Sequence, residues 1–193
     1  SELPKVLHQV GGLPMIDHVL DTVEAVSPAK VVVVIGPDME DVGRVCRHHT
    51  IVVQEERLGT GHAVLQAKET LQGFAGNILV VFGDTPLLTA DTILLMKRAL
   101  DDNRKHILAI LGFIPEIPTG YGRIRCKTDG TIESIVEELD ANSEDLKTTL
   151  CNSGVMIFRA EVMFKELVRV KNQNVKGEYY LTDLVSLVRD SGE

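Results

Sequence analysis

The sequence predicts an α/β protein: a three-layer α/β/α domain with a mostly parallel sheet and an inserted β-hairpin. Two observations carry this prediction. Continuous apolar runs such as VVVVIG (residues 31–36), which are typical of strands buried on both faces, alternate with stretches whose apolar residues recur at helical spacing. Late in the chain, the pair Asp129-Gly130 lies between two strand-like pieces and is a strong hairpin signal. Since strand–helix–strand units imply right-handed crossovers, we expect helices on both faces of the sheet.

The first half of the chain supplies the alternating units. A helix begins near Pro14, which suits a first helical turn, and its apolar residues follow helical spacing: Met15, Ile16, Val19, Leu20 and Val23. The predicted strands are residues 31–36, 50–56, 77–84 and 106–114, with a helix at residues 63–71. Either Thr89 or Asp91 can cap the helix that follows the third strand, because both side chains can accept a backbone hydrogen bond.

The second half begins with the hairpin. Its predicted strands are residues 122–127 and 131–137, and the polar segment LDANSEDLKTT that follows is a surface loop or a short helix. A further strand covers residues 151–159, and helices cover residues 161–170 and 182–188. Because no repeat, linker or low-complexity segment interrupts the chain, residues 1–193 form one domain in this prediction.

Composition excludes several classes of function. The chain is 44% hydrophobic and 25% charged, which is ordinary for a soluble globular protein. A formal net charge of -8 argues against nucleic acid or an anionic membrane as the main partner. The three cysteines are scattered without CxxC spacing, so we expect no disulfide framework, no structural zinc and a reducing, cytoplasmic location. Neither a signal peptide nor an apolar run of roughly 20 residues, the length that spans a bilayer, is recognisable.

Residues suited to binding lie at the ends of three predicted strands, where open α/β sheets bind their ligands. They are Gln54, the segment Phe82-Gly83-Asp84, and Asn152, which follows the Gly-rich stretch TGYG in sequence. A carboxylate such as that of Asp84 is suited to Mg²⁺, a hard ion that takes oxygen ligands. The same residue could equally cap a turn, and the residues alone leave both interpretations open.

The stretch LGTGHAVLQA (residues 58–67) also has two interpretations. Gly59-Thr60-Gly61 before a helix can expose backbone N–H groups at the positive end of the helix dipole, which suits an anion or a closely approached base. The stretch lacks the spacings of the dinucleotide-binding and P-loop motifs, so it can also be an ordinary turn that starts a helix. By itself, His62 is better explained as a helix-start or packing residue than as a general base.

Taken together, the motifs resemble one family. LPKVLHQVGGLPMIDHV, QEERLGTGHAV, VFGDTPLL, PTGYGRI, SIVEE, NSGV and GEYYLTD occur in this order along essentially the whole chain. Their order and spacing resemble the sugar-1-phosphate nucleotidyltransferases, in particular the uridylyltransferase domains of bacterial bifunctional N-acetylglucosamine-1-phosphate uridylyltransferase/glucosamine-1-phosphate acetyltransferases. The resemblance implies a Rossmann-like nucleotidyltransferase fold. It also implies a cytoplasmic bacterial protein with a second, acetyltransferase activity in a domain outside this chain.

The resemblance assigns roles to individual residues. Lys5 would contact the nucleotide phosphates, and Lys5 and Asp84 would be the catalytic residues. Gln54, Gly59 and Thr60 would read the uracil base, with glycine needed because a Cβ would obstruct the base. Phe82, Gly83 and Asp84 would line the nucleotide, and Asp84 would be the protein ligand of Mg²⁺. The residues implied for the amino sugar are Gly122, Glu137, Asn152, Tyr180 and Thr182.

The implied reaction joins UTP and N-acetylglucosamine-1-phosphate into UDP-N-acetylglucosamine and pyrophosphate by Mg²⁺-dependent in-line attack. Such chemistry needs mainly positioning and electrostatic stabilisation, so His62 needs no catalytic role. Two alternatives remain: a relative that uses another sugar phosphate or CTP, and a non-catalytic nucleotide-sugar binding module.

The chain also departs from the family pattern. We expect it to lack the family's N-terminal Gly-rich loop and its C-terminal end, which carries an asparagine ligand for Mg²⁺, so this fragment alone could be inactive. Leu139 replaces a common lysine, which bears on sugar specificity. Family trimers form through a C-terminal β-helix domain that is absent here, and the parent protein is expected to be a homotrimer of this kind.

Overall fold

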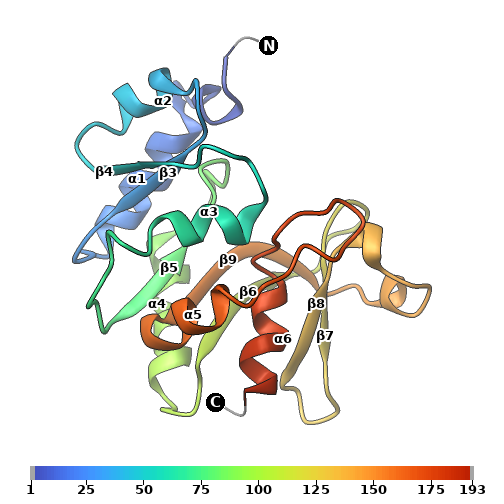
Figure 1. The fold of residues 1–193 in the computed structure, drawn as a ribbon. Helices are drawn as coiled ribbons and strands as arrows, with labels where there is room; N and C mark the ends of the chain where they lie inside the picture. The colour runs from blue at the N-terminus through green and yellow to red at the C-terminus, as the bar shows by residue number, and fades with distance from the viewer. Residues whose placement is uncertain (1–2, 192–193) are drawn as a thin grey trace.

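The computed structural model describes residues 3–191, whose strands form two main sheets and one short hairpin (Figure 1). The hairpin pairs β1 (Gln9–Val10) with β2 (Leu13–Pro14). The first main sheet pairs β3 (Val32–Ile35) with β4 (Thr50–Val53). The second contains β5 (Asn77–Val80), β6 (Leu108–Phe113), β7 (Arg123–Cys126), β8 (Ile132–Val136) and β9 (Cys151–Arg159). The predicted hairpin is β7–β8, and Gly130 at its turn has a φ of 83°.

The long strand β9 corrects the expectation of a mostly parallel sheet. It pairs antiparallel with β5 on one side and with β6 on the other. Therefore β5 and β6 run in the same direction, as a strand–helix–strand unit requires, but a later strand separates them. Among the described residues, only β3 and β4 pair in parallel. The sequence pattern indicated that β5 and β6 run in the same direction, but it could not reveal that a later, antiparallel strand lies between them.

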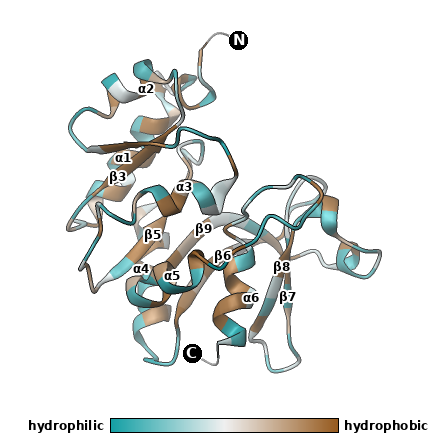
Figure 2. Cartoon of the chain, viewed as in Figure 1, coloured by the Kyte–Doolittle hydropathy of each residue, from teal (hydrophilic) through white to brown (hydrophobic). Residues whose placement is uncertain are grey.

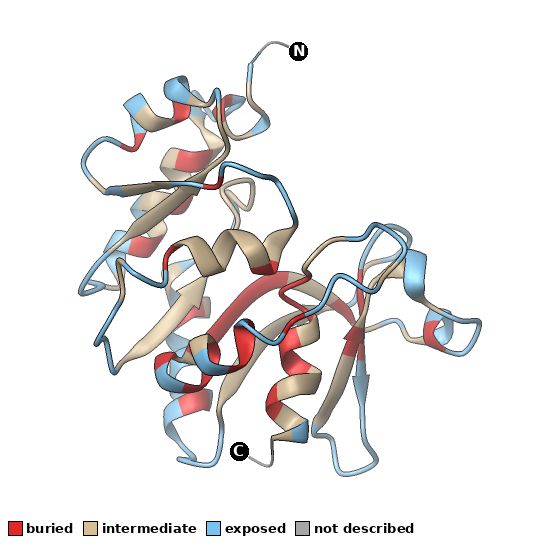
Figure 3. Cartoon of the chain, viewed as in Figure 1, coloured by how far each residue is buried: buried red, intermediate tan, exposed pale blue. Residues whose placement is uncertain are grey.

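Helices cover both faces of the large sheet, which confirms the three layers. The covering helices are α3 (Thr60–Gln66), α4 (Ala90–Asp101), α5 (Ala160–Leu167) and α6 (Asp183–Asp190). Alternate residues of β9 enter different cores: Met156 and Phe158 pack with α5 and α6, whereas Val155 and Ile157 pack with α4. Hydrophobic residues accordingly concentrate in the strands and on the inner helix faces, and most of β9 is buried (Figures 2 and 3).

The N-terminal part has its own small core around β3 and β4. It contains the 3-10 helix η1 (Lys5–Leu7) and the helices α1 (Met15–Ala25) and α2 (Glu40–Val45). Leu7, Ile16 and Val42 are buried there together. The short α2 was not predicted. Thr89 rather than Asp91 caps α4, because its side-chain oxygen accepts a hydrogen bond from Thr92 N at 3.3 Å.

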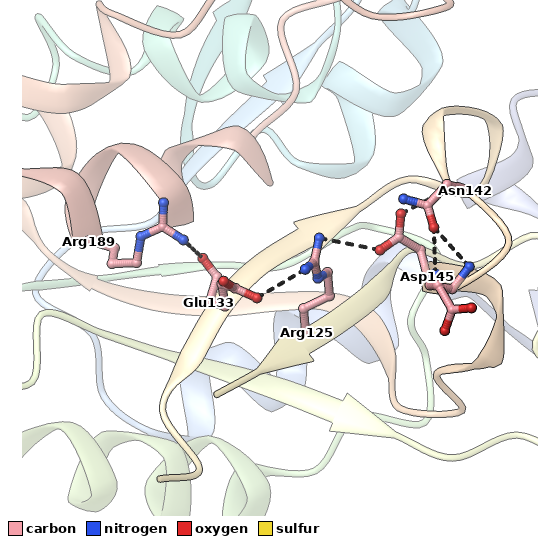
Figure 4. Close-up of polar contacts among 6 residues, drawn as sticks. Arg125, Glu133, Asn142, Asp145 and Arg189 are labelled. Atoms are coloured by element: carbon pink, nitrogen blue, oxygen red, sulfur yellow. Dashed lines mark hydrogen bonds and ion pairs between the residues drawn. The ribbon is translucent and has the colours of Figure 1, made fainter. Parts of the chain in front are cut away.

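A polar network fastens the hairpin to the C-terminal helix and to the loop that follows the hairpin (Figure 4). Arg189 of α6 donates to the carbonyl oxygen of Glu133 at 2.7 Å. Arg125 bridges the Glu133 carboxylate at 3.3 Å and Asp145 at 3.4 Å. Asp145 begins η3 (Asp145–Lys147), and η2 (Glu138–Asp140) precedes it, so the polar LDANSEDLKTT segment contains short helical turns. The hairpin thus has a fixed position beside α6.

Candidate active site

Two distant segments, residues 58–61 and residues 178–181, are joined by backbone hydrogen bonds, and we call this pair the loop clamp. Tyr179 N donates to Leu58 O at 2.7 Å, and Gly61 N donates to Tyr179 O at 2.8 Å. A third bond, from Leu181 N to the Thr60 side-chain oxygen, measures 3.0 Å. The GTG motif and the YYL motif therefore form one structural unit.

The clamp explains why residue 59 is glycine. Gly59 has a φ of 114°, a conformation that side chains rarely adopt, and a Cβ there would lie 2.7 Å from Tyr179 O. The sequence analysis expected a close approach at this position, but the group that approaches is the protein's own backbone. The Thr60 hydroxyl likewise has a structural partner in Leu181 N. Their role in reading a base remains a prediction.

Gln54 lies just before the clamp at the end of β4 and is 8% exposed. Its Nε2 lies 3.1 Å from Gly59 O and 2.9 Å from His62 Nδ1. The ring of His62 is in turn 6.2 Å from that of Tyr179. Sequence reasoning explained His62 as a helix-start or packing residue and did not predict its contact with Gln54, which depends on how the loop folds back.

Lys5 and Asp84, two residues that the resemblance nominates for separate roles, lie in contact in the structure. Lys5 Nζ lies 2.6 Å from Asp84 Oδ2, and their side chains are 75% and 31% exposed. A hydrogen bond from the ammonium to Asp84, together with charge attraction, raises the pKa of Lys5. A cation and a carboxylate are thus held side by side at the surface, where a phosphate could reach the cation.

The residues before Asp84 connect it to its surroundings. Gly83 packs under η1 and α1, because a Cβ there would lie 2.8 Å from the Ile16 side chain. The ring of Phe82 lies against Gly154, where an added Cβ would lie 2.1 Å from the ring. Since Asn152 Oδ1 accepts a hydrogen bond from Gly154 N at 3.0 Å, Phe82 and Asn152 contact the same residue of β9.

The residues predicted to hold the sugar form a second cluster. Asn152 N donates to Gly122 O at 2.9 Å, and a Cβ on Gly122 would lie 3.3 Å from both Glu137 carboxylate oxygens. Thr182 Oγ1 donates to Glu137 Oε1 at 3.1 Å. Burial raises the pKa of Glu137, although the bond from Thr182 opposes that shift. The structure therefore brings Gly122, Glu137, Asn152 and Thr182 together.

Acidic residues that sequence reasoning missed surround this cluster. Burial raises the pKa of Asp183 to about 6, and the charges of Asp140 and Glu137 add to the shift. Burial also raises the pKa of Tyr180, and the same carboxylates add to that shift. Asp140 and Asp183 are far apart in sequence, so only the fold reveals that they face Glu137. The clamp and this cluster are contiguous, because Leu181 belongs to one and Thr182 to the other.

Among residues 3–191 there is no group of three or more His, Cys, Asp or Glu side chains arranged to hold a metal. A lone carboxylate still fits Mg²⁺, which is usually bound by one or two carboxylates while water and substrate phosphates fill the other positions. The donor set around Asp84 is therefore compatible with a magnesium ion that arrives with a nucleotide.

Two surface cavities lie apart from the Lys5–Asp84 pair and the Glu137 cluster, and the second of them reaches Tyr179 of the loop clamp. One, of about 370 Å³, is lined by residues of η1, α2 and their neighbours, and the other, of about 700 Å³, by residues 168–173 with Tyr179 and Leu187. No residue predicted for the site lines either of them. In the part of the chain that the structure describes, no helix has both the length and the hydropathy to cross a membrane.

The sequence matches a known family. The model of the MobA-like NTP transferase domain matches residues 1–113. Over 192 residues the chain is 47% identical to the bifunctional protein GlmU of Paramagnetospirillum magneticum, and 47% identical to that of Rhodospirillum rubrum. The alignments include all of this chain but only 42% and 43% of those proteins, so the chain spans less than half the length of these curated relatives.

Solved structures agree on the fold. UDP-glucose pyrophosphorylase complexed with UDP-glucose superposes with a TM-score of 0.73 at 18% identity, covering 99% of this chain and 80% of that one. The apo form gives 0.71 at 18% identity, covering 97% and 80%. At this identity the likeness concerns the fold alone, and it confirms the predicted Rossmann-like nucleotidyltransferase architecture. The chain belongs to the family of MobA-like NTP transferase domains and is a nucleotidyltransferase of the GlmU type.

Proposed function

We propose that this chain transfers a uridylyl group from UTP to N-acetylglucosamine-1-phosphate, forming UDP-N-acetylglucosamine and pyrophosphate. One observation carries the proposal: the loop clamp and the Glu137 cluster meet at consecutive residues, Leu181 and Thr182. A group bound at the clamp and a group bound at the cluster would therefore be neighbours, as the two halves of a nucleotide sugar are. The 47% identity to bifunctional GlmU proteins supports the same assignment.

In this reaction a phosphate oxygen of the sugar phosphate attacks the α-phosphorus of UTP. The new O–P bond forms as the bond between the α-phosphorus and the bridging oxygen breaks, and pyrophosphate leaves with that electron pair. Lys5 offsets the charge that builds on the phosphates. The ion pair with Asp84 keeps the Lys5 ammonium protonated, since it raises the pKa of Lys5. No side chain has to form a covalent intermediate.

Asp84 would hold Mg²⁺, which supplies Lewis-acid neutralisation of phosphate charge when it is bound. The Glu137 carboxylate would accept hydrogen bonds from sugar hydroxyls, and the Asn152 amide would donate to or accept from them. Tyr180 and Thr182 would flank the acetamido group. We further propose that the whole protein acts in the bacterial cytoplasm as a homotrimer and also acetylates glucosamine-1-phosphate through a separate domain.

The test measures pyrophosphate release by the full-length protein that carries this chain. UTP with N-acetylglucosamine-1-phosphate should be the fastest pair, and Asp84→Asn should lower the rate on the order of a hundredfold. Asp91→Asn is the matched control, because Asp91 is an exposed carboxylate at the start of α4 and should leave the rate unchanged.

Three outcomes would contradict the proposal. Faster release with CTP would assign the site to a different base. Faster release with glucose-1-phosphate would assign it to a different sugar, to which the exposed Leu139 would be relevant. Binding of UDP-N-acetylglucosamine without any turnover would make the domain a binding module.

A further inference from the structure

His62 lies at the start of α3 with its ring between two glutamine side chains. Its Nδ1 is 2.9 Å from Gln54 Nε2, and its Nε2 is 3.1 Å from Gln66 Nε2. Gln54 Nε2 also lies 3.1 Å from Gly59 O, and Gln66 Nε2 lies 3.1 Å from the His62 carbonyl oxygen. The proposed reaction gives the ring no chemistry to perform, so its contacts need another explanation.

The contact with Gly59 determines where the protons are. A backbone carbonyl oxygen can only accept, so the Gln54 atom facing it must be the NH₂ nitrogen. The second hydrogen of that nitrogen then points to His62 Nδ1, which must be an acceptor and therefore carries no proton. This contact therefore favours the tautomer of His62 whose proton is on Nε2.

The contact with Gln66 would favour the opposite tautomer. The NH₂ group of Gln66 faces His62 Nε2, which would then have to accept a hydrogen bond. The buried contact outweighs it. Placing the Gln54 oxygen against Gly59 O would bring two acceptors together around a side chain that is only 8% exposed. Gln66 is more exposed, and its amide can turn so that water completes its hydrogen bonds.

With both hydrogens engaged, the free polar atom of Gln54 is Oε1. Among residues 3–191 this oxygen has no hydrogen-bond partner. The fully buried side-chain atom that lacks a partner in this part of the chain is Arg123 Nε, so Gln54 Oε1 is not completely buried. It presents a pure acceptor next to the loop clamp.

We propose that His62 is a positioning residue that sets base selectivity by holding Gln54 with Oε1 free. The inference rests on the proposed function. An acceptor here suits a pyrimidine whose ring nitrogen carries a hydrogen, as in uracil. It opposes cytosine, whose corresponding ring nitrogen carries a lone pair. Without His62 the amide keeps only its hydrogen bond to Gly59 O and can turn about that bond, so Oε1 no longer has a fixed position and the discrimination weakens.

The experiment compares kcat/KM for UTP and CTP in the full-length protein and three variants at His62. Asparagine can place an acceptor where Nδ1 lies, whereas glutamine reaches the position of Nε2 and leucine supplies no acceptor. His62→Asn should keep the UTP-to-CTP ratio within about threefold of the wild type. His62→Gln and His62→Leu should lower it at least tenfold, through a higher KM for UTP with little change in kcat.

Gln66→Ala is the control, since it removes the other neighbour of the ring and should leave the ratio unchanged. In a Gln54→Ala background, His62→Leu should have no further effect on the ratio. A folded His62→Gln variant with wild-type selectivity would overturn the inference, as would equal losses for asparagine and glutamine. If the wild type released no pyrophosphate from UTP, the proposed function itself would fail, which is a separate outcome.

Discussion

Replacing Gly59 by alanine tests whether the loop clamp holds the protein together. The new Cβ would lie 2.7 Å from Tyr179 O, 2.9 Å from Tyr179 N and 3.0 Å from Glu178 Cβ. Backbone atoms cannot swing aside as the end of a flexible side chain can. The residue would also have to keep a φ of 114°, so the two segments must separate or the backbone must change.

The cost can be estimated from these contacts. A non-glycine residue held in a sparsely populated backbone region costs about 1–3 kcal/mol. Losing two of the clamp's hydrogen bonds adds about 1 kcal/mol each. Gly59→Ala should therefore lower the free energy of unfolding by about 3–5 kcal/mol, a large part of the 5–15 kcal/mol that is typical of a domain.

Gly73→Ala separates the contact from the backbone conformation. Gly73 also has a positive φ, 77°, but a Cβ there would meet nothing within 4 Å, so only about 1 kcal/mol should be lost. Urea unfolding followed by circular dichroism measures both variants. If Gly59→Ala lost no more stability than Gly73→Ala, the clamp would not constrain residue 59 and the reasoning would be refuted.

Two further predictions concern the same region. Thr60→Val should lower the free energy of unfolding in urea by about 1–2 kcal/mol, because Leu181 N loses its hydrogen-bond partner. Thr60→Ser keeps the hydroxyl and should retain most of that stability. Equal stability of the two variants would contradict the bond. Asp183 binds its proton more tightly in the folded protein, with its pKa at about 6 against 3.8 ordinarily, so stability should fall as the pH rises from about 4 to about 6. Asp183→Asn should flatten that slope and raise stability at pH 7 by about 1–2 kcal/mol, a value reduced for partial solvent screening; an unchanged thermal-unfolding profile would show that Asp183 does not titrate in this range.

The sequence predicted the local elements well because their signals are local. Apolar runs identified the strands, and Asp129-Gly130 identified the hairpin. The position of β9 between β5 and β6 could not be predicted, because strand order depends on contacts between residues far apart in the chain. The class and the layers were therefore predictable, while the mixed direction of the sheet was not.

The same distinction applies to the candidate site. Motifs nominated Lys5 and Asp84, and the structure pairs them at 2.6 Å. Motifs also nominated Gly59, but for contact with a ligand, whereas its geometry already follows from Tyr179. Asp183 escaped notice, and the contacts of His62 were not predicted, because what matters about both residues is which groups face them, and no spacing in the sequence encodes that.

The loop clamp also constrains how the protein is made. Its bond between Thr60 and Leu181 joins residues 121 positions apart. Contacts of such long range form slowly, because the entropy of closing the intervening chain must be lost before the contact stabilises anything. On the ribosome, the GTG motif emerges long before the YYL motif that completes it. We therefore expect α3 to acquire its final N-terminal turn only late in synthesis, so that residues 58–61 would be among the last parts of the chain to become ordered.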